Sequence, residues 1–333
     1  MKKIGWVLVG ASTIAKEWMV DAIRAAGGEI LSVVSGDTAR GADFAVAHGI
    51  PASFTKLDEA LAQPGVNAVY ISTTNQRHLP QTLAAAQAGK HVLCEKPLAL
   101  ALADAQAMVA ACSQAGVRLG TNHHLRNAVA HHAIRQLVRD GAIGRPRYVR
   151  VFHAVQLPAH LQGWRVNSAQ AGGGVVLDIS VHDADTLRFI LDDEAVKVVA
   201  MTSGGAAGLE QGVMASIQFG NGVLAQIHDA FDAPYAPTGL EVHGSTGSII
   251  ATGVMGQRAG GEVRVRDADG ERVVPLAHEN LYQRAVSNFH AAIRGEGQPS
   301  ASGIDGVRSL ELALAIQQSA QTGQAVAVRQ EAV

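Results

Sequence analysis

Three side chains in this sequence could bind a ligand and take part in acid–base chemistry: a lysine, an aspartate and a histidine. Lys96 follows the apolar run 91–94 and Glu95, and it precedes Pro97. Pro97 cannot join a sheet ladder and disfavours helical backbone at Lys96. We therefore expect extended backbone at the carboxyl end of a buried strand, where open α/β sheets bind ligands. A solvated loop lysine is the alternative.

Asp178 and His182 form the second candidate group. They follow the glycine run 172–174 in a stretch that predicts a helix, so their spacing of four residues puts both on one helix face. A carboxylate beside an imidazole orients it for acid–base work near neutral pH. The glycines would let backbone approach a ligand closely. The alternative is an ordinary ion pair with a flexible entry.

The chain begins with a pattern for dinucleotide binding. A strand at 4–9, a turn at 10–15, a helical stretch and a second strand at 29–35 make a βαβ unit. The turn keeps Gly10 and Ala15 of the G-x-G-x-x-G/A pattern but has Ser12 at the second glycine. The Ser12 hydroxyl could bond a phosphate, or it could simply cap the helix.

The end of the second strand bears on the choice between NAD and NADP. An acid there usually grips the ribose 2′-hydroxyl of NAD. Here Ser35 and Gly36 end the strand, with Asp37 and Arg40 behind them. A small hydroxyl and an arginine favour the 2′-phosphate of NADP. Asp37 would favour NAD unless it caps a helix that starts at Thr38.

The remaining pattern predicts how these residues are positioned. Further βα units (strands 67–72, 91–94 and 117–121, helices 80–88 and 103–115) complete an N-terminal Rossmann domain over 1–122. Strands at 147–156, 196–203, 212–219, 222–228, 240–242, 263–266 and 271–274, with late helices at 281–294 and 307–320, predict a second α+β domain over 123–333. We expect its sheet to be large, open and mostly antiparallel, so the fold class is α/β with two domains.

Composition and charge bear on the partners and the cellular compartment of the protein. The chain has 333 residues and a formal net charge of −2, which disfavours a nucleic-acid partner. Two cysteines, Cys94 and Cys112, suit a reducing compartment. The start resembles a signal peptide, but its apolar run is short and leads into a helix start, so we expect a cytoplasmic protein without membrane spans.

Two histidine pairs, at 123–124 and 131–132, suggest a metal at first sight. They have neither cysteines nor a carboxylate at ligand spacing, so we predict cleft or surface histidines and no metal.

Taken together, these motifs resemble the glucose–fructose oxidoreductase/inositol dehydrogenase (Gfo/Idh/MocA) family of nicotinamide-dependent sugar oxidoreductases. The matching residues are the turn 10–15, Glu95-Lys96-Pro97, and the glycines leading to Asp178 and His182. Within the family, the strings at 10–15, 72–75, 120–127 (with Thr-Asn-His-His-Leu-Arg-Asn), 152–155 and 160–165 resemble one reductase of a cyclic keto-sugar. The resemblance covers essentially the whole chain.

The resemblance implies a reactive cluster of Lys96, Asp178 and His182. It also implies a set of residues around NADP(H), which together with the turn comprises Gly10, Ala11, Ser12, Thr13, Ile14, Ala15, Ser35, Gly36, Arg40, Thr73, Thr74, Asn75, Gln76, Arg77, His78, Glu95, Lys96, Asn122, Trp164, Arg165 and Tyr282. Family members often associate through the open sheet face, so monomer and homo-oligomer both stay open.

The function that follows is NADPH-dependent reduction of a keto-sugar, with Lys96 polarising the carbonyl and His182, oriented by Asp178, donating the proton. An NAD(P)-dependent dehydrogenase of another cyclic polyol or sugar is the alternative enzyme. A non-catalytic redox sensor that binds NADP and a protein partner is the alternative outside enzymes, and it predicts that Lys96 and His182 are dispensable.

Overall fold

The computed structural model describes residues 3–205 and 208–328, which divide into two units. The first unit contains residues 3–123 and Tyr282–Val307, and the second contains His124–Leu281 and residues 308–328. The expected domain boundary at 122 lies one residue from this division. The segment Tyr282–Val307, however, returns to the first unit, whereas the sequence placed it in the second domain.

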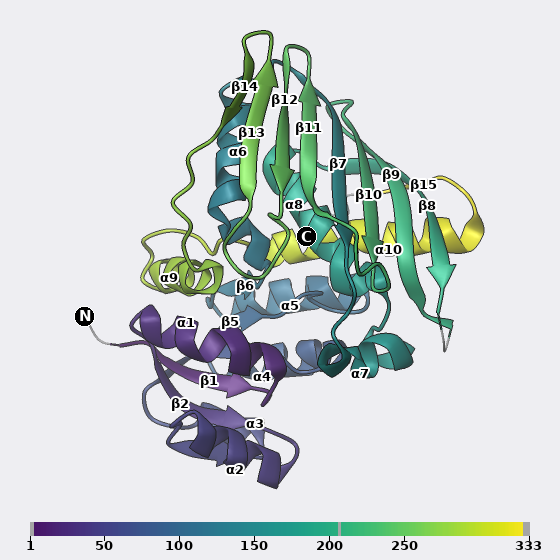
Figure 1. Ribbon diagram of the computed structural model, residues 1–333. Helices are drawn as coiled ribbons and strands as arrows, with labels where there is room; N and C mark the ends of the chain where they lie inside the picture. The colour runs from purple at the N-terminus through teal and green to yellow at the C-terminus, as the bar shows by residue number, and fades with distance from the viewer. Residues whose placement is uncertain (1–2, 206–207, 329–333) are drawn as a thin grey trace. The chain divides into compact units, whose positions relative to one another are not determined.

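The first unit is built on a parallel sheet with the strand order β3-β2-β1-β4-β5-β6 (Figure 1). The strands are β1 (Gly5–Val9), β2 (Glu29–Val34), β3 (Ala52–Phe54), β4 (Val66–Ile71), β5 (His91–Cys94) and β6 (Leu119–Thr121). The helices are α1 (Val20–Ala25), α2 (Thr38–Ala47), α3 (Leu57–Leu61), α4 (His78–Gln87), α5 (Leu102–Gln114) and α9 (Leu281–Ile293). This strand order is that of a Rossmann fold, as the sequence predicted.

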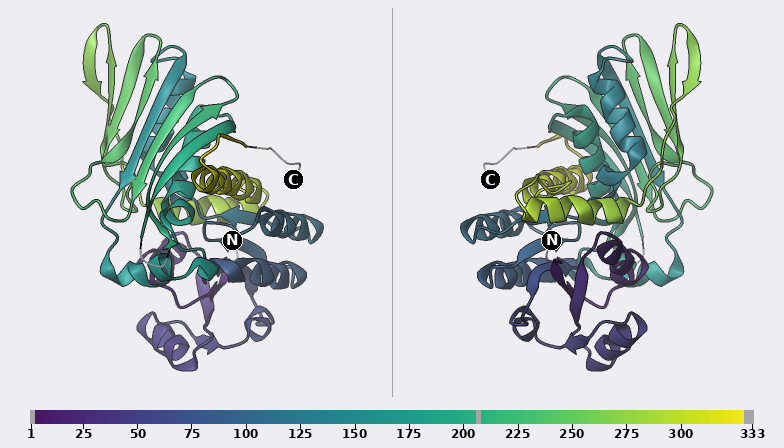
Figure 2. Two further views of the ribbon diagram at one scale, coloured as in Figure 1. Left: turned by 90° about the vertical axis from the view of Figure 1, so that its right-hand side faces the viewer. Right: turned by 90° about the vertical axis from the view of Figure 1, so that its left-hand side faces the viewer.

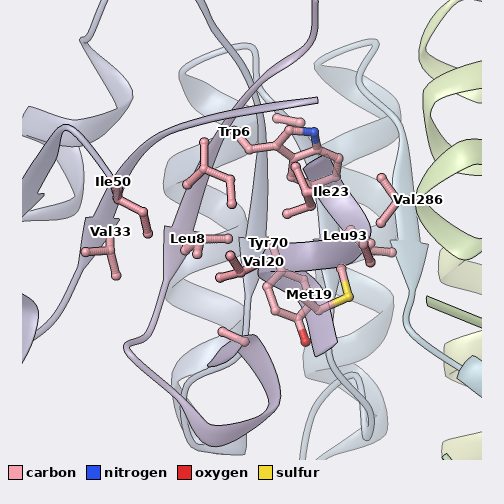
Figure 3. Packing of buried hydrophobic residues seen from close by; sticks show 14 of the residues in the cluster. Trp6, Leu8, Met19, Val20, Ile23, Val33, Ile50, Tyr70, Leu93 and Val286 are labelled. Carbon is pink, nitrogen blue, oxygen red and sulfur yellow. The ribbon is translucent and has the colours of Figure 1, made fainter. Parts of the chain in front are cut away.

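Helix α9 belongs to the first unit because it completes that unit's core. Trp6 on β1 is fully buried, and its indole Nε1 donates to Nε2 of His290 at 3.0 Å. Its ring also packs on Phe289, 5.6 Å between centroids. Val286 lies in the same cluster as Leu8, Met19 and Tyr70 (Figure 3). A single domain boundary in the sequence cannot describe a segment that returns to the first unit.

The second unit is built on a sheet with the order β14-β13-β12-β11-β7-β10-β9-β8-β15. Neighbouring strands are antiparallel except β7 and β10, which confirms the mostly antiparallel sheet. The strands are β7 (Pro146–Ala154), β8 (Ala195–Gly204), β9 (Glu210–Phe219), β10 (Leu224–Ala230), β11 (Thr238–Gly244), β12 (Gly247–Thr252), β13 (Glu262–Asp267), β14 (Gly270–Val273) and β15 (Val326–Ala327). The helices are α6 (Val129–Arg139), α7 (Ala159–Asn167), α8 (Val181–Leu191) and α10 (Gly303–Thr322), the last starting in the first unit.

The two faces of this second sheet differ. Helices α6 and α8 lie against one face (Figure 2), where Val149 and Val151 of β7 are buried. The alternate residues Tyr148 and Arg150 are exposed on the other face. Side chains alternate in this way along a half-buried strand, so residues of β7 and β10 that point inward lie under helix α8.

Candidate active site

Gly10 makes the turn after β1 possible. Its φ of +115° is open to glycine, and a Cβ there would lie 3.0 Å from the carbonyl oxygen of Ser72. The Gly10 N–H donates to the carbonyl of Val34 at 2.9 Å, which ties the turn to the end of β2. The turn is therefore held at the carboxyl edge of the sheet, where the sequence placed it.

Ser12 caps the start of the following helix. Its hydroxyl accepts from the N–H of Ala15 at 3.1 Å and lies 2.7 Å from the hydroxyl of Ser72. The helix begins with a π-helical turn at Ala15–Met19 and continues as α1. Ala15 is fully buried in the core, while Ala11, Thr13 and Ile14 are partly or fully exposed along the turn. The capping role is thus present, and a phosphate contact by Ser12 stays a prediction.

Asp37 acts as the N-cap of α2. Its Oδ1 accepts from the N–H of Arg40 at 3.0 Å. The hydroxyl of buried Ser35 accepts from Nε of Arg40 at 3.4 Å, and both Gly36 and Arg40 are exposed. The carboxylate of Asp37 therefore has a structural task, and an arginine lies beside the hydroxyl at the strand end.

The polar run after β4 forms a short 3₁₀ turn, Asn75–Arg77, before α4. Thr74 precedes the turn, Asn75 is buried, and Gln76 and Arg77 are exposed. Thr73 is half-buried, and its hydroxyl donates to Oε1 of Gln81 at 2.6 Å.

The His78 ring is buried, and both of its nitrogens lie close to backbone carbonyl oxygens. Its Nδ1 lies 3.0 Å from the carbonyl oxygen of Pro97, and its Nε2 lies 3.2 Å from that of Thr73. Burial lowers its pKa. The imidazole therefore connects the loop after β4 with the turn that follows Lys96, and both of its nitrogens face the protein rather than a ligand.

Glu95 anchors the stretch that carries Lys96. Its Oε1 accepts from the hydroxyl of Tyr70 at 2.5 Å and from Nδ2 of Asn122 at 2.6 Å. Burial raises the pKa of Glu95, while the two donors and the Lys96 ammonium oppose that rise. Burial also raises the pKa of Tyr70, which keeps its proton as a donor. The Lys96–Pro97 peptide bond is cis.

Tyr282 supports the turn from within the core. It is 1% exposed, and its ring stacks on Trp18 with centroids 5.2 Å apart. Asn122 is 2% exposed, and its Oδ1 has no hydrogen-bond partner among the described residues. An unpaired buried acceptor is costly unless a ligand or water satisfies it. This oxygen is thus suited to a cofactor donor.

In the second unit, the glycine run packs against the chain itself. A Cβ on Gly173 would lie 2.8 Å from the carbonyl oxygens of Trp164 and Arg165, and the N–H of Gly174 donates to the Arg165 carbonyl at 2.8 Å. The sequence assigned these glycines to ligand approach. The structure shows that Gly173 admits the 164–165 backbone, and close approach of a ligand to these glycines stays a prediction.

Arg165 bonds Asp178, the residue predicted to orient His182. Its Nε donates to Oδ2 of Asp178 at 3.1 Å, and its guanidinium lies over the Trp164 ring at 4.7 Å. A residue expected beside the cofactor is therefore paired with one expected in the reactive cluster. Orientation of His182 by Asp178 stays a prediction.

His182 lies in α8 directly after a second π-helical turn, Val176–Ser180, which contains Asp178. Turns of this kind occur frequently at functional sites. His182 is 6% exposed, and its ring meets the edge of His124 with centroids 4.6 Å apart. Lys96 belongs to the first unit and His182 to the second, so their meeting in one cluster is still a prediction.

The structure also reveals a polar group that sequence reasoning missed. Asp183 and Asp229 are both fully buried, and Nδ1 of His153 donates to Oδ1 of Asp183 at 3.0 Å. Burial raises the pKa of Asp183 from 3.8 to about 7. It raises that of Asp229 further, helped by the neighbouring charge of Asp183. Four acidic or imidazole residues within 178–185 were a usable signal, since an ordinary surface helix does not bury so many.

Three of the four histidines in the two pairs are buried. His123 and His124 are buried, and His131 bonds the carbonyl of Leu125 at 2.9 Å with its pKa lowered to about 4 by burial. Within residues 3–205 and 208–328, no group of three or more His, Cys, Asp or Glu is arranged to hold a metal ion. Over the same residues, no helix is long and apolar enough to cross a membrane.

Comparison with known proteins identifies the family to which both parts of the chain are similar. Residues 4–123 match the oxidoreductase family with an NAD-binding Rossmann fold, and residues 131–250 match the GFO/IDH/MocA C-terminal domain. The chain is 56% identical to 1,5-anhydro-D-fructose reductase of Ensifer adhaerens, over 97% of this chain and 98% of that protein. This is the keto-sugar reductase that the sequence strings resemble.

Two other oxidoreductases are similar to this chain at lower sequence identity. Myo-inositol 2-dehydrogenase of Thermotoga maritima is 29% identical over 84% of each chain. The crystal structure of aldose–aldose oxidoreductase from Caulobacter crescentus, complexed with glycerol, superposes with a TM-score of 0.89 at 28% identity, over 98% of this chain and 99% of that one.

Proposed function

The chain belongs to the Gfo/Idh/MocA family of oxidoreductases, and from this premise we propose that it reduces 1,5-anhydro-D-fructose to 1,5-anhydro-D-mannitol with NADPH. The observation that carries the proposal is the 56% identity to 1,5-anhydro-D-fructose reductase along nearly the whole of both chains. The positions of Lys96, Asp178 and His182 support it, since each lies at a strand end or helix start suited to ligand contact.

The residues of this chain would bind the ketone and donate one proton to its oxygen. A reduced nicotinamide, when bound, supplies a hydride to the carbonyl carbon. The Lys96 ammonium stabilises the negative charge that develops on the carbonyl oxygen. His182 donates the proton that converts this oxygen to a hydroxyl, so the balance is one hydride and one proton added to one ketone.

The first unit fits a dinucleotide through residues of the β1 and β2 ends. Gly10 and Ser12 form the turn, Ser35 and Arg40 would hold the ribose 2′-phosphate, and the unpaired Oδ1 of Asn122 would accept a cofactor donor. Preference for NADPH over NADH is supported by Asp37, because its carboxylate is engaged as a helix cap.

The open face of the second sheet is the surface through which a homo-oligomer would form. Met201 and Met214 are paired in register on β8 and β9 and are 79% and 53% exposed, and a shallow cavity of about 550 Å³ lies over these strands. Analytical ultracentrifugation of the wild type and of Met201→Asp tests this. An oligomer that Met201→Asp leaves unchanged, or a monomeric wild type, would contradict it.

A cytoplasmic location remains our proposal for the compartment. Cys94 and Cys112 are buried free thiols, which suits a reducing environment.

Steady-state oxidation of NADPH with a panel of keto-sugars tests the proposed reaction. We expect 1,5-anhydro-D-fructose to give the highest kcat/KM and the product to be the mannitol epimer by chromatography. A panel of cyclic polyols with NAD or NADP is the matched reverse assay. Faster oxidation of a polyol than reduction of any keto-sugar would favour a dehydrogenase instead.

A further inference from the structure

A second imidazole packs directly against His182, the proposed proton donor. His124 and His182 are both buried, their ring centroids lie 4.6 Å apart, and their ring planes meet at 78°. Aromatic rings favour this perpendicular arrangement at centroid distances of about 4.5–7 Å. The sequence assigned no chemical task to His124, whereas the structure places its ring on the one imidazole that the proposed reaction uses.

The short turn that carries His124 is fixed at both of its sides. It is a 3₁₀ turn, His124–Asn127, and all of its residues are buried. Nε of Arg126 donates to Oδ2 of Asp185 at 2.7 Å, and that carboxylate is 1% exposed. The carbonyl oxygen of Leu125 lies 2.9 Å from Nδ1 of buried His131 on α6. Bonds between charged groups are short and directional, so the turn has little freedom to slide along α8.

The contacts of this turn follow one face of α8. His182, Asp185 and Phe189 are three and four residues apart, so they lie one above another on the helix surface. His124 contacts the first of them and Arg126 bonds the second, with its guanidinium 5.3 Å from the centroid of the third. The anchor at Asp185 therefore determines where the His124 ring meets the helix.

A ring held in this way can determine the orientation of its neighbour. A helical side chain commonly occupies either of two χ1 wells, and a proton donor works only when it points at the reacting atom. The sequence assigned this orienting task to Asp178, whose Oδ2 accepts from Arg165. His124 presents a full ring face or edge to the imidazole, which restricts its rotation by packing.

We infer that His124 is a positioning residue for His182. Its ring, anchored through Arg126 and Asp185, keeps the His182 imidazole in the rotamer that donates the proton to the keto-sugar. This rests on the proposed function. The inference separates two properties of His124, the shape of the ring and the hydrogen bonding of its nitrogens, and assigns the positioning to the shape.

Steady-state kinetics of His124→Leu and His124→Phe test the inference. Leucine fills a similar volume without a ring, so kcat for 1,5-anhydro-D-fructose at saturating NADPH should fall roughly ten- to a hundredfold, as expected for a misplaced reacting group. Phenylalanine keeps the perpendicular ring contact, so its kcat should stay within roughly threefold of the wild type. KM for NADPH should be unchanged in both variants.

The solvent isotope effect on kcat separates placement of the proton donor from a general loss of packing. In His124→Leu, proton transfer should become the slow step, so D₂O should lower kcat more than it does in the wild type. A smaller fraction of folded enzyme would leave this effect unchanged. His132→Leu is the matched control, because the half-buried His132 makes a similar ring contact with Phe189 on the same helix, 5.2 Å between centroids. It should keep the wild-type kcat and isotope effect.

A change at the anchor gives a second test, which decides if His124→Leu does not fold. Arg126→Lys keeps the charge but has no planar guanidinium to fit Asp185, so the turn should shift while His124 itself remains. We expect a lower kcat and a larger solvent isotope effect in this variant too. Wild-type values of both would overturn the inference.

The remaining outcomes distinguish this inference from the proposed function. A wild type that reduces no keto-sugar overturns both. With an active wild type, an unchanged kcat in His124→Leu overturns the inference alone. Equal losses in His124→Leu and His124→Phe would do the same, because the nitrogens and not the ring shape would then be needed. A rise in KM for NADPH with unchanged kcat would place His124 in cofactor binding instead.

Discussion

At the scale of single residues, the bond between Arg165 and Asp178 changes how the reactive group is understood. The sequence assigned Asp178 to hold His182, whereas the structure shows its Oδ2 engaged by Arg165 at 3.1 Å. Removing the carboxylate would therefore disturb Arg165 and the Trp164 ring beneath it as well as the imidazole. Effects at Asp178 should be spread over binding and turnover.

His182→Ala should lower kcat by about 10²–10⁴, the usual contribution of a positioned general acid. NADPH binding, followed by cofactor fluorescence, should change little. Asp178→Asn should be milder in kcat because the imidazole is still present. Near wild-type turnover in His182→Ala would mean that the proton comes from another group, with Lys96 as the next candidate.

Arg40→Ala should raise KM for NADPH far more than KM for NADH. A charge-assisted contact to a phosphate contributes about 1.5–3 kcal/mol, or roughly ten- to over a hundredfold in affinity. Arg40 is exposed, so its removal should not disturb folding, and measuring both cofactors on one preparation controls for a folding defect. Equal losses for both would remove Arg40 from recognition of the 2′-phosphate.

At the scale of elements, most long periodic segments were predicted and most short ones were not. Strands β1, β4 and β9 stand out as apolar or alternating runs, and their positions are confirmed. The sequence analysis did not find β3, α3 or β15, which have five residues or fewer and give too little pattern to detect. It also did not find the longer elements β12 and α6. It also missed α7, which Gly163 interrupts with a φ of +32°.

The site was predictable to the extent that its residues occur in motifs. The Asp37 cap and the Gly10 turn could be derived from local chemistry, and both are present. Tyr70 and Asp229 could not be found in this way, because each acts through a partner far along the chain, Glu95 and Asp183 respectively. Contacts between strands depend on register, which a single sequence does not specify.

Ala15→Leu tests the contact between the first turn and the core. Ala15 is fully buried, so three added carbons must overpack the site, which typically costs about 1–3 kcal/mol. We expect weaker binding of NADPH and NADH alike, together with a lower Tm by calorimetry. Ala47→Leu, the same change at an exposed position of α2, serves as control. Wild-type binding and stability in Ala15→Leu would contradict this packing.

At the scale of the whole molecule, the raised pKa values of the buried Asp183 and Asp229 link stability to pH. A carboxyl whose pKa is raised on folding binds more protons folded than unfolded, so stability falls as pH rises above its unfolded pKa. For Asp183 this fall runs from about pH 4 to about pH 7, and for Asp229 it extends higher. Each retained proton lowers the free energy of unfolding by about 1.4 kcal/mol per pH unit.

Asp229→Asn should therefore become more stable relative to the wild type as pH increases. Urea unfolding between about pH 5 and about pH 8 should give a difference that grows by up to about 1.4 kcal/mol per unit. The exposed Asp140→Asn is the matched control and should run parallel to the wild type. A constant difference across this range would show that Asp229 is ionised when folded.

The π-helical turn at Val176–Ser180 makes chain length itself a constraint on activity. A π turn holds one residue more than the α turn it replaces. Deleting one residue would restore a regular helix, and the turns on either side would nearly keep their directions, because five residues of a π turn cover about the same rotation as four α-helical residues. A deletion between Asp178 and His182 would, however, shorten their spacing from four residues to three and change the angle between the two side chains around the helix. Among related chains, the length of this turn should therefore be compared as well as its residues.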